Sequence, residues 1–304
     1  VEELPIRRDS GFRAWLPIMY GCDNFCTYCI VPYVRGRERS REPAAILAEF
    51  RQLVEQGYKE ITLLGQNVNS YGKGLEHPID FADLLNLLCE VPGDYQIRFM
   101  TSHPKDASKK LFDTIAKYPK IAKQFHLPFQ SGNDRVLKAM NRHYNREEYL
   151  KLAHYGRQIM PELVLTSDVI VGFPGETEAD FRTTYEFLER LAPAYLHIFP
   201  FSERPGTPAV DFPDKVQSSV ATRRVEELEK LCRRLHGEFC ARAEGTTDEV
   251  LFESTMRGGM MFGYTGNYRR VKVPYDRSRI NTICRVRLGR MDDANDLEGE
   301  IVDN

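Results

Sequence analysis

The sequence predicts an α/β protein: a parallel sheet of six strands, open or curled into a partial barrel, followed by a small antiparallel β-barrel. Two observations support this fold class. Through about residue 210, short apolar segments alternate with stretches of helical period, and βα units in series indicate a parallel sheet. From about residue 245, short strand-like segments are separated by Gly, Asn and Asp, a pattern typical of an antiparallel barrel.

Six apolar segments are the predicted strands of the sheet. They span 14–19, 60–65, 96–101, 124–129, 164–172 and 195–201. A loop rich in Gly, Pro, Ser, Asn or His follows each one. Because functional groups of parallel sheets lie on the loops after the strand C-termini, we expect these loops to form one rim that holds a cofactor.

The segments between the strands have helical period. In 43–57, Ile46, Phe50 and Leu53 belong to one apolar stripe, with Pro43 suited to the first turn and Gly57 to the end. A long charged helix is expected over 214–243. The predicted strands of the small barrel are 248–254, 261–267, 269–274, 283–288 and 298–302.

Composition indicates a globular protein of a reducing compartment. Apolar residues make up 42% of the chain and charged residues 28%, ordinary values for a protein with a real core. No apolar run of about 18 residues predicts a transmembrane helix. Seven cysteines, three of them clustered, do not suggest a secreted disulfide framework, so we expect a cytoplasmic protein. Residues 1–10 are interpreted as a linker from an upstream segment, which would make the chain a fragment.

Charge is unevenly distributed along a chain of net charge −2. Between Arg257 and Arg290 there are nine basic residues and one acid, Asp276, whereas the segment from 291 onward has six acids and no base. A local basic face of this kind favours a polyanionic partner.

Three cysteines lie within eight positions, at Cys22, Cys26 and Cys29. Structural zinc takes four ligands, and a disulfide would leave one thiol over. A 4Fe–4S cluster normally takes four thiolates, so three leave one iron open to bind a substrate or cofactor. An iron–sulfur site is therefore the favoured interpretation, with zinc and unliganded thiols as the alternatives.

This spacing after the first strand of a βα protein resembles the radical S-adenosylmethionine (SAM) enzymes. The resemblance implies a six-stranded partial (βα) barrel. It also implies a 4Fe–4S cluster whose open iron binds SAM, which one electron cleaves to a 5′-deoxyadenosyl radical. Tyr28, before the third cysteine, matches the family's aromatic residue against the adenine.

Five motifs in order are similar to those of the methylthiotransferases, closest to the tRNA-2-methylthio-dimethylallyladenosine synthases. They are "GCDNFCTYCIVPYVRGRERSR", "LLGQNVNSYG", "HLPFQSGNDRVLKAMNR", "SDVIVGFPGETEADF" and "FPFSERPGTPA". The resemblance implies methylthiolation at C2 of a prenylated adenosine beside the tRNA anticodon, and an electron donor such as a flavodoxin or ferredoxin. The small barrel resembles the TRAM domain, an RNA-binding module.

Three rival functions stay open. The same chemistry on threonylcarbamoyl-adenosine tRNA or on a ribosomal protein is the close alternative. An RNA-binding fragment without turnover is the alternative from another class. We expect a monomer without a membrane, divided into a linker at 1–10, a radical SAM domain at 11–240 and a TRAM-like domain at 241–304.

The resemblance and the rim positions select candidate cofactor-binding residues. The alternative for the "GFPGETE" segment is a tight turn that starts a helix, and His126 in an apolar strand is interpreted as a core histidine. The candidates are Tyr28, Gln66, Asn67, Ser102, Gln130, Ser131, Asp168, Gly172 and Glu176.

Two basic groups are candidates for RNA contact, with a solvated surface as the alternative. Arginines beside the cysteines suit phosphate, and aromatic and cationic residues of one hairpin suit single-stranded RNA. The residues are Arg35, Arg37, Arg39 and Arg41, then Tyr264, Arg269, Arg270 and Lys272.

The four other cysteines are interpreted as buried apolar residues. They are Cys89, Cys232, Cys240 and Cys284. The family carries a second 4Fe–4S cluster, bound by three cysteines of an N-terminal domain, that supplies the sulfur. We expect no ligands for this second cluster among the residues of this sequence.

Overall fold

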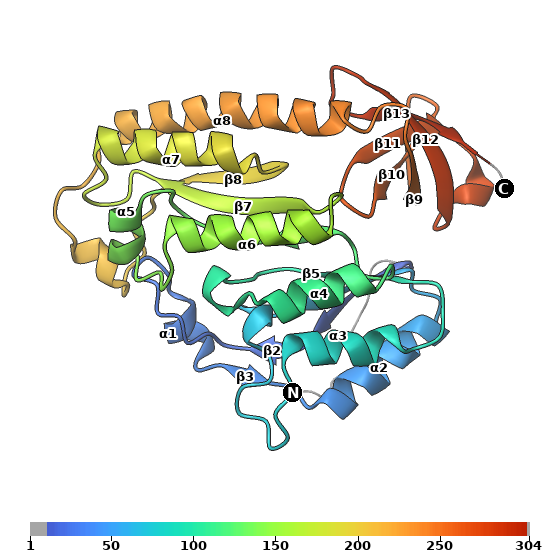
Figure 1. The fold of residues 1–304 in the computed structure, drawn as a ribbon, viewed down its shortest axis with the longest axis horizontal. Coiled ribbons are helices and arrows are strands. Elements are labelled where there is room, and N and C mark those ends of the chain that lie inside the picture. Colours follow the sequence, from blue (N-terminus) through green and yellow to red (C-terminus); the bar gives the residue numbers. More distant parts are fainter. Residues whose placement is uncertain (1–10, 303–304) are drawn as a thin grey trace.

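A computed structural model describes residues 11–302. The linker predicted at residues 1–10 lies outside this range. Two groups of parallel strands run through the first part of the chain (Figure 1). The first group is β1 (Arg13–Pro17), β4 (Glu60–Leu64) and β5 (Gln96–Phe99), and the second is β6 (Gln124–His126), β7 (Val164–Val171) and β8 (Tyr195–Pro200).

The two groups follow one another as a single curved layer. Parallel pairs join β1 to β4, β4 to β5, β6 to β7 and β7 to β8. A parallel bridge between Ile97 and Ile121 connects β5 to the segment that leads into β6. The six predicted strands are thus confirmed, in chain order.

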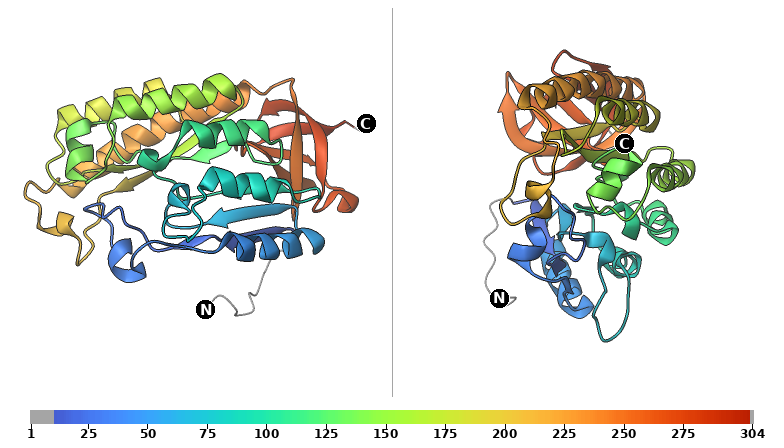
Figure 2. Two further views of the ribbon diagram at one scale, coloured as in Figure 1. Left: turned by 60° about the horizontal axis from the view of Figure 1, so that its bottom comes forward. Right: turned by 90° about the vertical axis from the view of Figure 1, so that its left-hand side faces the viewer.

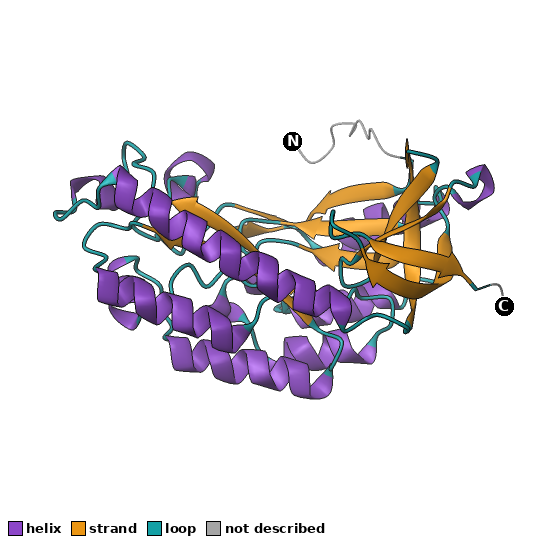
Figure 3. Cartoon of the chain, turned by 90° about the horizontal axis from the view of Figure 1, so that it is seen from above, coloured by secondary structure: helices purple, strands orange, loops and turns teal. Residues whose placement is uncertain are grey.

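Helices cover the outside of this layer, so the apolar face of each strand is buried against them (Figure 3). Phe99 of β5 packs edge-on against both Phe81 and Phe125, at ring-centroid distances of 5.1 and 5.2 Å. Capping boxes begin α3, α6 and α7 at Asp80, Asn145 and Thr177. The helices are α2 (Pro43–Glu55), α3 (Phe81–Cys89), α4 (Lys109–Lys117), α5 (Asp134–Ala139), α6 (Arg146–Ile159), α7 (Glu178–Leu191) and α8 (Ser218–Ala241).

Short elements complete this part of the chain. The predicted first strand is interrupted after Pro17, and Met19–Tyr20 (β2) pairs instead with Arg39–Ser40 (β3) in an antiparallel ribbon. This ribbon closes the base of the cysteine loop. The others are α1 (Val31–Arg35) and the 3₁₀ turns η1 (Val68–Ser70), η2 (Pro104–Asp106) and η3 (Pro208–Asp211). A fourth 3₁₀ turn, η4 (Arg277–Arg279), belongs to the C-terminal part.

The C-terminal part is a closed five-stranded barrel in the order β10-β11-β13-β12-β9. The predicted small barrel is confirmed, but one of its strand pairs, β11 with β13, is parallel rather than antiparallel. Val250, Phe252, Val271 and Val286 lie in its interior and are inaccessible to solvent. The strands are β9 (Thr247–Arg257), β10 (Met260–Thr265), β11 (Arg270–Pro274), β12 (Ile283–Met291) and β13 (Leu297–Ile301).

The small barrel packs against the N-terminal ends of the parallel strands (Figure 2). Arg98 is 2% exposed; its Nε lies 2.6 Å from Glu60, and its terminal nitrogens donate to the carbonyls of Thr265 and Gly266. Arg13 lies 2.6 Å from Glu253 of β9. The small barrel is thus at the opposite end of the strands from the predicted rim. Within residues 11–302, no helix is long and apolar enough to cross a membrane.

Candidate iron–sulfur and cofactor site

The cysteine loop leaves β2 at the rim and returns through α1. Cys22 and Cys26 are buried and Cys29 is half-buried, and all three are free thiols. The backbone N–H of Cys29 donates to the carbonyl of Cys26 at 2.9 Å, and that of Cys22 donates to the carbonyl of Gly36 at 3.2 Å. The loop therefore presents three thiols from a compact, hydrogen-bonded segment.

A second segment holds the loop in place. Thr27 donates through its Oγ1 to the carbonyl of Ala139 at 2.9 Å, and Nδ2 of Asn141 donates to the carbonyl of Phe25 at 2.9 Å. At Gly21, with φ of +73°, a Cβ would lie 2.1 Å from the carbonyl oxygen of Arg37. Only glycine fits where the loop leaves the ribbon.

Arg142 lies against the thiols, a residue that the sequence analysis did not select. It is 8% exposed, its Nη1 lies 3.4 Å from Sγ of Cys26, and its Nη2 donates to the carbonyl of Pro128. Burial raises the pKa values of the Cys22 and Cys29 thiols. At Cys29 the charge of the Arg142 guanidinium lowers the pKa and partly counters burial, which favours the thiolate form that binds metals.

The two neighbouring rim loops contain buried polar atoms without a hydrogen-bond partner in the described part of the chain. They are Oε1 of Gln66, Oδ1 of Asn67, Oδ1 of Asn69, Oγ of Ser102 and Nε2 of His103. Buried polar groups normally have partners. A set of five beside three free thiols fits a polar cofactor bound to a cluster, and three of the five belong to the predicted set.

Three other predicted cofactor residues have mixed surroundings. Tyr28 packs against the apolar group that contains Phe173. Gln130 has φ of +67° and joins the sheet by backbone hydrogen bonds to Asp168 and Ile170. Ser131 is 1% exposed, and its hydroxyl oxygen accepts from the backbone N–H of Asn133. The side chain of Ser131 thus supports the start of α5.

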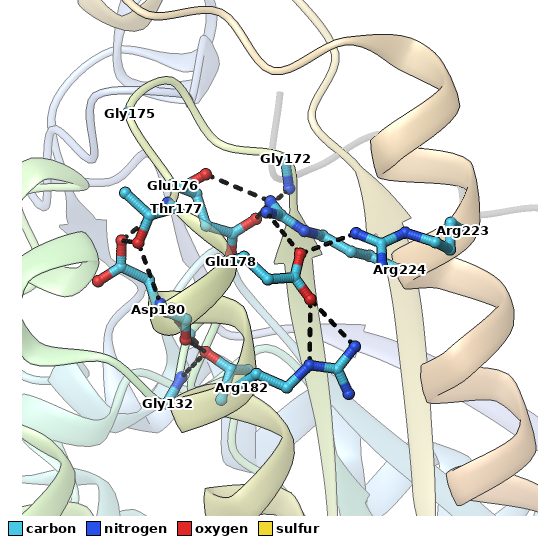
Figure 4. A network of polar contacts seen from close by, with 12 residues as sticks. Gly132, Gly172, Gly175, Glu176, Thr177, Glu178, Asp180, Arg182, Arg223 and Arg224 are labelled. Atoms are coloured by element: carbon cyan, nitrogen blue, oxygen red, sulfur yellow. Dashed lines mark hydrogen bonds and ion pairs between the residues drawn. The ribbon is translucent and has the colours of Figure 1, made fainter.

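Glu176 and Gly172 form a buried turn between β7 and α7 (Figure 4). The carboxylate of Glu176 accepts from the backbone N–H of Gly172 at 2.6 Å and from Arg224 of α8 at 2.7 Å. Burial raises the pKa of Glu176 to about 7. These contacts agree with the alternative interpretation as a tight turn, and the roles of Gly172 and Glu176 toward a cofactor stay predictions.

Asp168 faces two histidines inside the layer. Its Oδ1 lies 2.9 Å from Nδ1 of His197, and its Oδ2 lies 3.5 Å from Nε2 of His126. Burial alone would raise the pKa of Asp168, but hydrogen bonds from the two histidines lower it to about 2. Oγ1 of Thr166 also lies 2.9 Å from Nδ1 of His126, and the side chain is 12% exposed, which agrees with the interpretation of His126 as a core histidine with polar partners. His197 was not selected from the sequence, although in "YLHIFPF" it stands between the half-buried Leu196 and Ile198.

The arginine run beside the cysteines divides into two kinds. Arg35, Arg37 and Arg39 are exposed. Arg41 is 7% exposed, donates to the carbonyl of Pro17 and lies 3.0 Å from Glu49. Arg41 therefore holds the ribbon and α2 together and is not available to phosphate.

Two of the three cations of the hairpin are paired with acids within the small barrel. Arg270 lies 3.2 Å from Asp296, and Lys272 lies 2.6 Å from Asp292. Arg269 stacks on Phe239, with its guanidinium carbon 4.0 Å from the ring centroid. Tyr264 is half-buried. The acidic turn after β12 thus pairs with two of the hairpin cations, and contact of this hairpin with RNA stays a prediction.

The remaining cysteines lie away from the cluster loop. Cys89, Cys240 and Cys284 are buried and Cys232 is half-buried. The prediction that they are packed side chains agrees with these surroundings.

Comparison with known proteins identifies the family of this chain. Residues 16–188 match the Radical SAM superfamily. The chain belongs to this superfamily, whose cofactors are a 4Fe–4S cluster and SAM.

The chain is 45% identical over 305 residues to the tRNA-2-methylthio-N(6)-dimethylallyladenosine synthase of Thermoanaerobacter pseudethanolicus, across 100% of this chain and 64% of that protein. It is 48% identical over 266 residues to the synthase of the same name from Pelotomaculum thermopropionicum, across 88% of this chain and 59% of that protein. The chain thus spans under two thirds of the length of these relatives.

Solved structures agree on the fold. The radical SAM methyltransferase TsrM from Kitasatospora setae, with cobalamin and a 4Fe–4S cluster bound, superposes with a TM-score of 0.54 at 15% identity, over 83% of this chain and 39% of that one. Coproporphyrinogen III oxidase (HemN) from Escherichia coli superposes with a TM-score of 0.53 at 15% identity, over 96% of this chain and 72% of that one. The predicted radical SAM fold class is confirmed.

Proposed function

We propose that this chain is the radical SAM part of a tRNA methylthiotransferase, which adds a methylthio group to C2 of a prenylated adenosine beside the anticodon. The observation that carries the proposal is the loop of three free thiols, Cys22, Cys26 and Cys29, in a chain 45% identical to enzymes named for this product.

Different residues of the rim would hold the 4Fe–4S cluster and SAM. Cys22, Cys26 and Cys29 would hold the cluster, with Arg142 balancing its negative charge. The unpaired oxygens of Gln66, Asn67 and Ser102 would receive the polar groups of SAM, with Tyr28 and Gln130 beside them. When bound, the cluster and SAM supply carbon-radical chemistry at the rim.

Three residues would hold the loops around the cofactor in place. Ser131 supports the start of α5, and the carboxylate of Glu176 binds the backbone of Gly172. Asp168 would orient His126 and His197, the two histidines that it contacts. By these contacts the chain orients the cofactor and excludes water from the rim.

The RNA partner would be held by two surfaces. Arg35, Arg37 and Arg39 are exposed beside the cysteine loop and suit phosphate. Tyr264 and the cations of the hairpin would add contacts from the small barrel after they exchange their acidic partners for phosphates. An electron donor such as a flavodoxin or ferredoxin, a monomeric state, a cytoplasmic location and the division at residues 10 and 240 stay predictions. No residue of this sequence is assigned to a second 4Fe–4S cluster.

Mass spectrometry of tRNA hydrolysates tests this proposal. The chain, joined to the N-terminal domain of one of its relatives, is expressed in bacteria that lack the endogenous enzyme, and 2-methylthio-prenyladenosine is expected. The chain alone should leave the adenosine prenylated only, because it offers no ligands for the cluster that supplies the sulfur. A methylthio group on threonylcarbamoyl-adenosine instead would favour the close alternative.

The matched control for this experiment is Cys26→Ala. It should yield prenylated adenosine without the methylthio group. Product at the wild-type level from Cys26→Ala would contradict the proposal.

A further inference from the structure

A cavity of about 300 Å³ lies where helix ends meet the small barrel, at the opposite end of the strands from the cysteine loop. The C-terminal ends of α6 and α8 both point toward the small barrel (Figure 1). Three arginines from different elements line the cavity, which we call the arginine pocket. They are Arg157 in the last turn of α6, Arg242 at the end of α8 and Arg269 in the turn between β10 and β11.

The floor of the arginine pocket is apolar and buried. Val164 of β7, Ala194 before β8 and Phe239 of α8 are 3%, 6% and 5% exposed. The volume of the pocket is at the lower end for small-molecule sites, about 300–1,000 Å³. A small ligand in this pocket would therefore contact a buried floor with three cations around it.

Two of the arginines are held in place by helix ends. Arg157 donates through Nη1 to the carbonyl of Leu191 at 2.6 Å and through Nη2 to that of Ala192 at 2.9 Å. The guanidinium carbon of Arg269 lies 4.0 Å from the ring centroid of Phe239, and its Nη2 donates to the carbonyl of Phe239 at 3.3 Å. Both guanidinium groups are thus oriented by neutral carbonyls, which do not cancel their charge.

The positive charge of the arginine pocket is not balanced within residues 11–302, where none of the three arginines forms an ion pair. Two acids lie nearby: Glu162 is exposed at the wall, and Asp248 attracts Arg269 without pairing with it. Burial lowers the pKa values of Arg157 and Arg269, and the charge of Arg242 lowers them further. Because the arginines repel one another, an anion between them would be stabilising.

Two of the arginines also retain hydrogen-bond donors. Nε of Arg269 is buried and has no partner in the described part of the chain. Arg242 is exposed, and its guanidinium forms no hydrogen bond with the other described residues. Buried donors normally have partners. These donors therefore suit an anionic acceptor.

Capping of helix C-termini is the competing explanation for these arginines. Cations stabilise such ends through the helix dipole and the last carbonyls. This explains Arg157, which donates to two carbonyls at the end of α7. It does not explain why Arg242, which donates to no helix carbonyl in the described residues, and Arg269 meet at the same cavity.

We propose that the arginine pocket binds a phosphate group, whose oxygens accept from Arg242 and Arg269 while Arg157 adds positive charge. The planar guanidinium group matches the spacing of phosphate oxygens. The phosphate belongs either to an RNA backbone or to a small free ligand, and the chemistry of its recognition is the same. The proposal goes beyond the proposed function and does not depend on it, because the pocket is remote from the cysteine loop.

Isothermal titration calorimetry with inorganic phosphate tests this pocket. The chain is kept in a buffer free of phosphate and sulfate, and chloride holds the ionic strength constant. Wild-type protein should bind phosphate saturably. Arg242→Gln and Arg269→Gln should each weaken binding about tenfold or more, because each removes a hydrogen bond to a charged group.

Thermal stability separates phosphate binding from helix capping at Arg242. Without phosphate, Arg242→Gln should have a thermal midpoint equal to or above that of the wild type, because a repelling cation is removed. Loss of a helix cap would lower the midpoint instead. Phosphate should raise the midpoint of the wild type more than that of Arg242→Gln.

Arg233→Gln is the matched control for Arg242→Gln. Arg233 lies on the same helix, is 64% exposed and is 3.9 Å from Glu229, outside the arginine pocket. The control should bind phosphate like the wild type.

An anticodon stem–loop RNA identifies the source of the phosphate. If this RNA displaces inorganic phosphate, and Arg242→Gln reduces the slope of log K against log salt for the RNA by roughly 1, the pocket holds a backbone phosphate. If RNA and phosphate bind together and the slope is unchanged, the pocket holds a free ligand. Both results support the arginine pocket.

Two results would overturn the arginine pocket. One is a wild-type protein that does not bind phosphate, and the other is phosphate binding that is unchanged in both Arg242→Gln and Arg269→Gln. Either would assign the arginines to helix capping. Failure of the methylthiolation experiment would affect the proposed function alone, because phosphate binding is measured without SAM or prenylated RNA.

Discussion

The carboxylate of Glu176 lies 2.7 Å from Nη1 of Arg224, and the two side chains are only 1% and 3% exposed. This pair fastens the turn after β7 to the long helix α8. The same turn follows the strand that carries Asp168, so the pair supports the rim from outside (Figure 4).

Replacing Arg224 by Met should destabilise the protein strongly. The change leaves the Glu176 carboxylate buried without its cation, which costs about 3–5 kcal/mol. Arg223→Met is the matched control, because Arg223 is 51% exposed and contacts Glu178 in solvent. Its effect should be about 0–1 kcal/mol. Urea unfolding measures both, and equal losses would contradict a special role for the buried pair.

Replacing any of the three loop cysteines by Ala should abolish the cluster. The wild-type chain should hold about four irons after anaerobic reconstitution, as one cubane requires. Cys26→Ala should lose this iron together with the visible absorption of the cluster. Cys89→Ala, which changes a buried cysteine of α3, should keep both. Iron retained in Cys26→Ala would disprove the ligand assignment.

The Asp168–His197 contact should make stability depend on pH above neutrality. The folded pKa of His197 is raised by Asp168, so its contribution is complete below the ordinary histidine pKa of about 6.5 and is lost as pH rises through the folded value. Wild type should therefore exceed Asp168→Asn in free energy of unfolding by more at pH 6 than at pH 9.

Asp134→Asn, which changes an exposed carboxylate near Arg146, is the control for this comparison. It should show no such difference between the two pH values. The same gap between wild type and Asp168→Asn at both pH values would show that His197 titrates independently of Asp168.

Neutralising Arg35 and Arg39 together should weaken tRNA binding and flatten its salt dependence. Each lost phosphate contact should reduce the slope of log K against log salt by roughly 1. Arg41→Gln should instead lower stability, because Arg41 is buried against Pro17 and Glu49. An unchanged slope in Arg35→Gln/Arg39→Gln would assign these arginines to a solvated surface.

The sequence predicted the strands and the cluster loop because both are local patterns. Apolar runs of four to eight residues between polar loops define β4, β5 and β7 almost to the residue. The three cysteines that indicate an iron–sulfur site, Cys22, Cys26 and Cys29, lie in one loop, so their spacing can be recognised in the sequence.

Contacts between distant segments could not be predicted in the same way. Arg142 meets Cys26 only after α5 has packed beside the loop. In the sequence, Arg41 cannot be distinguished from the exposed arginines before it. Its burial follows from the packing of α2, which places Glu49 against it. Lys272 and Asp292 are joined by the closure of the small barrel, and charge counts along the chain do not reveal that pairing.

The anchor between the two barrels has a consequence for how such proteins diverge. Arg98 reaches the small barrel through backbone carbonyls of Thr265 and Gly266, which every amino acid sequence would offer. The side chains of Thr265 and Gly266 can therefore change while these two contacts are kept, although Tyr268 of the same turn stacks on Arg98. A chimera that carries a foreign small barrel should thus dock in register as long as Arg98, Glu60, an aromatic residue at 268 and the Arg13–Glu253 pair are retained. Under the proposed function, exchange of this module would be a route to new RNA targets without redesign of the parallel-sheet part.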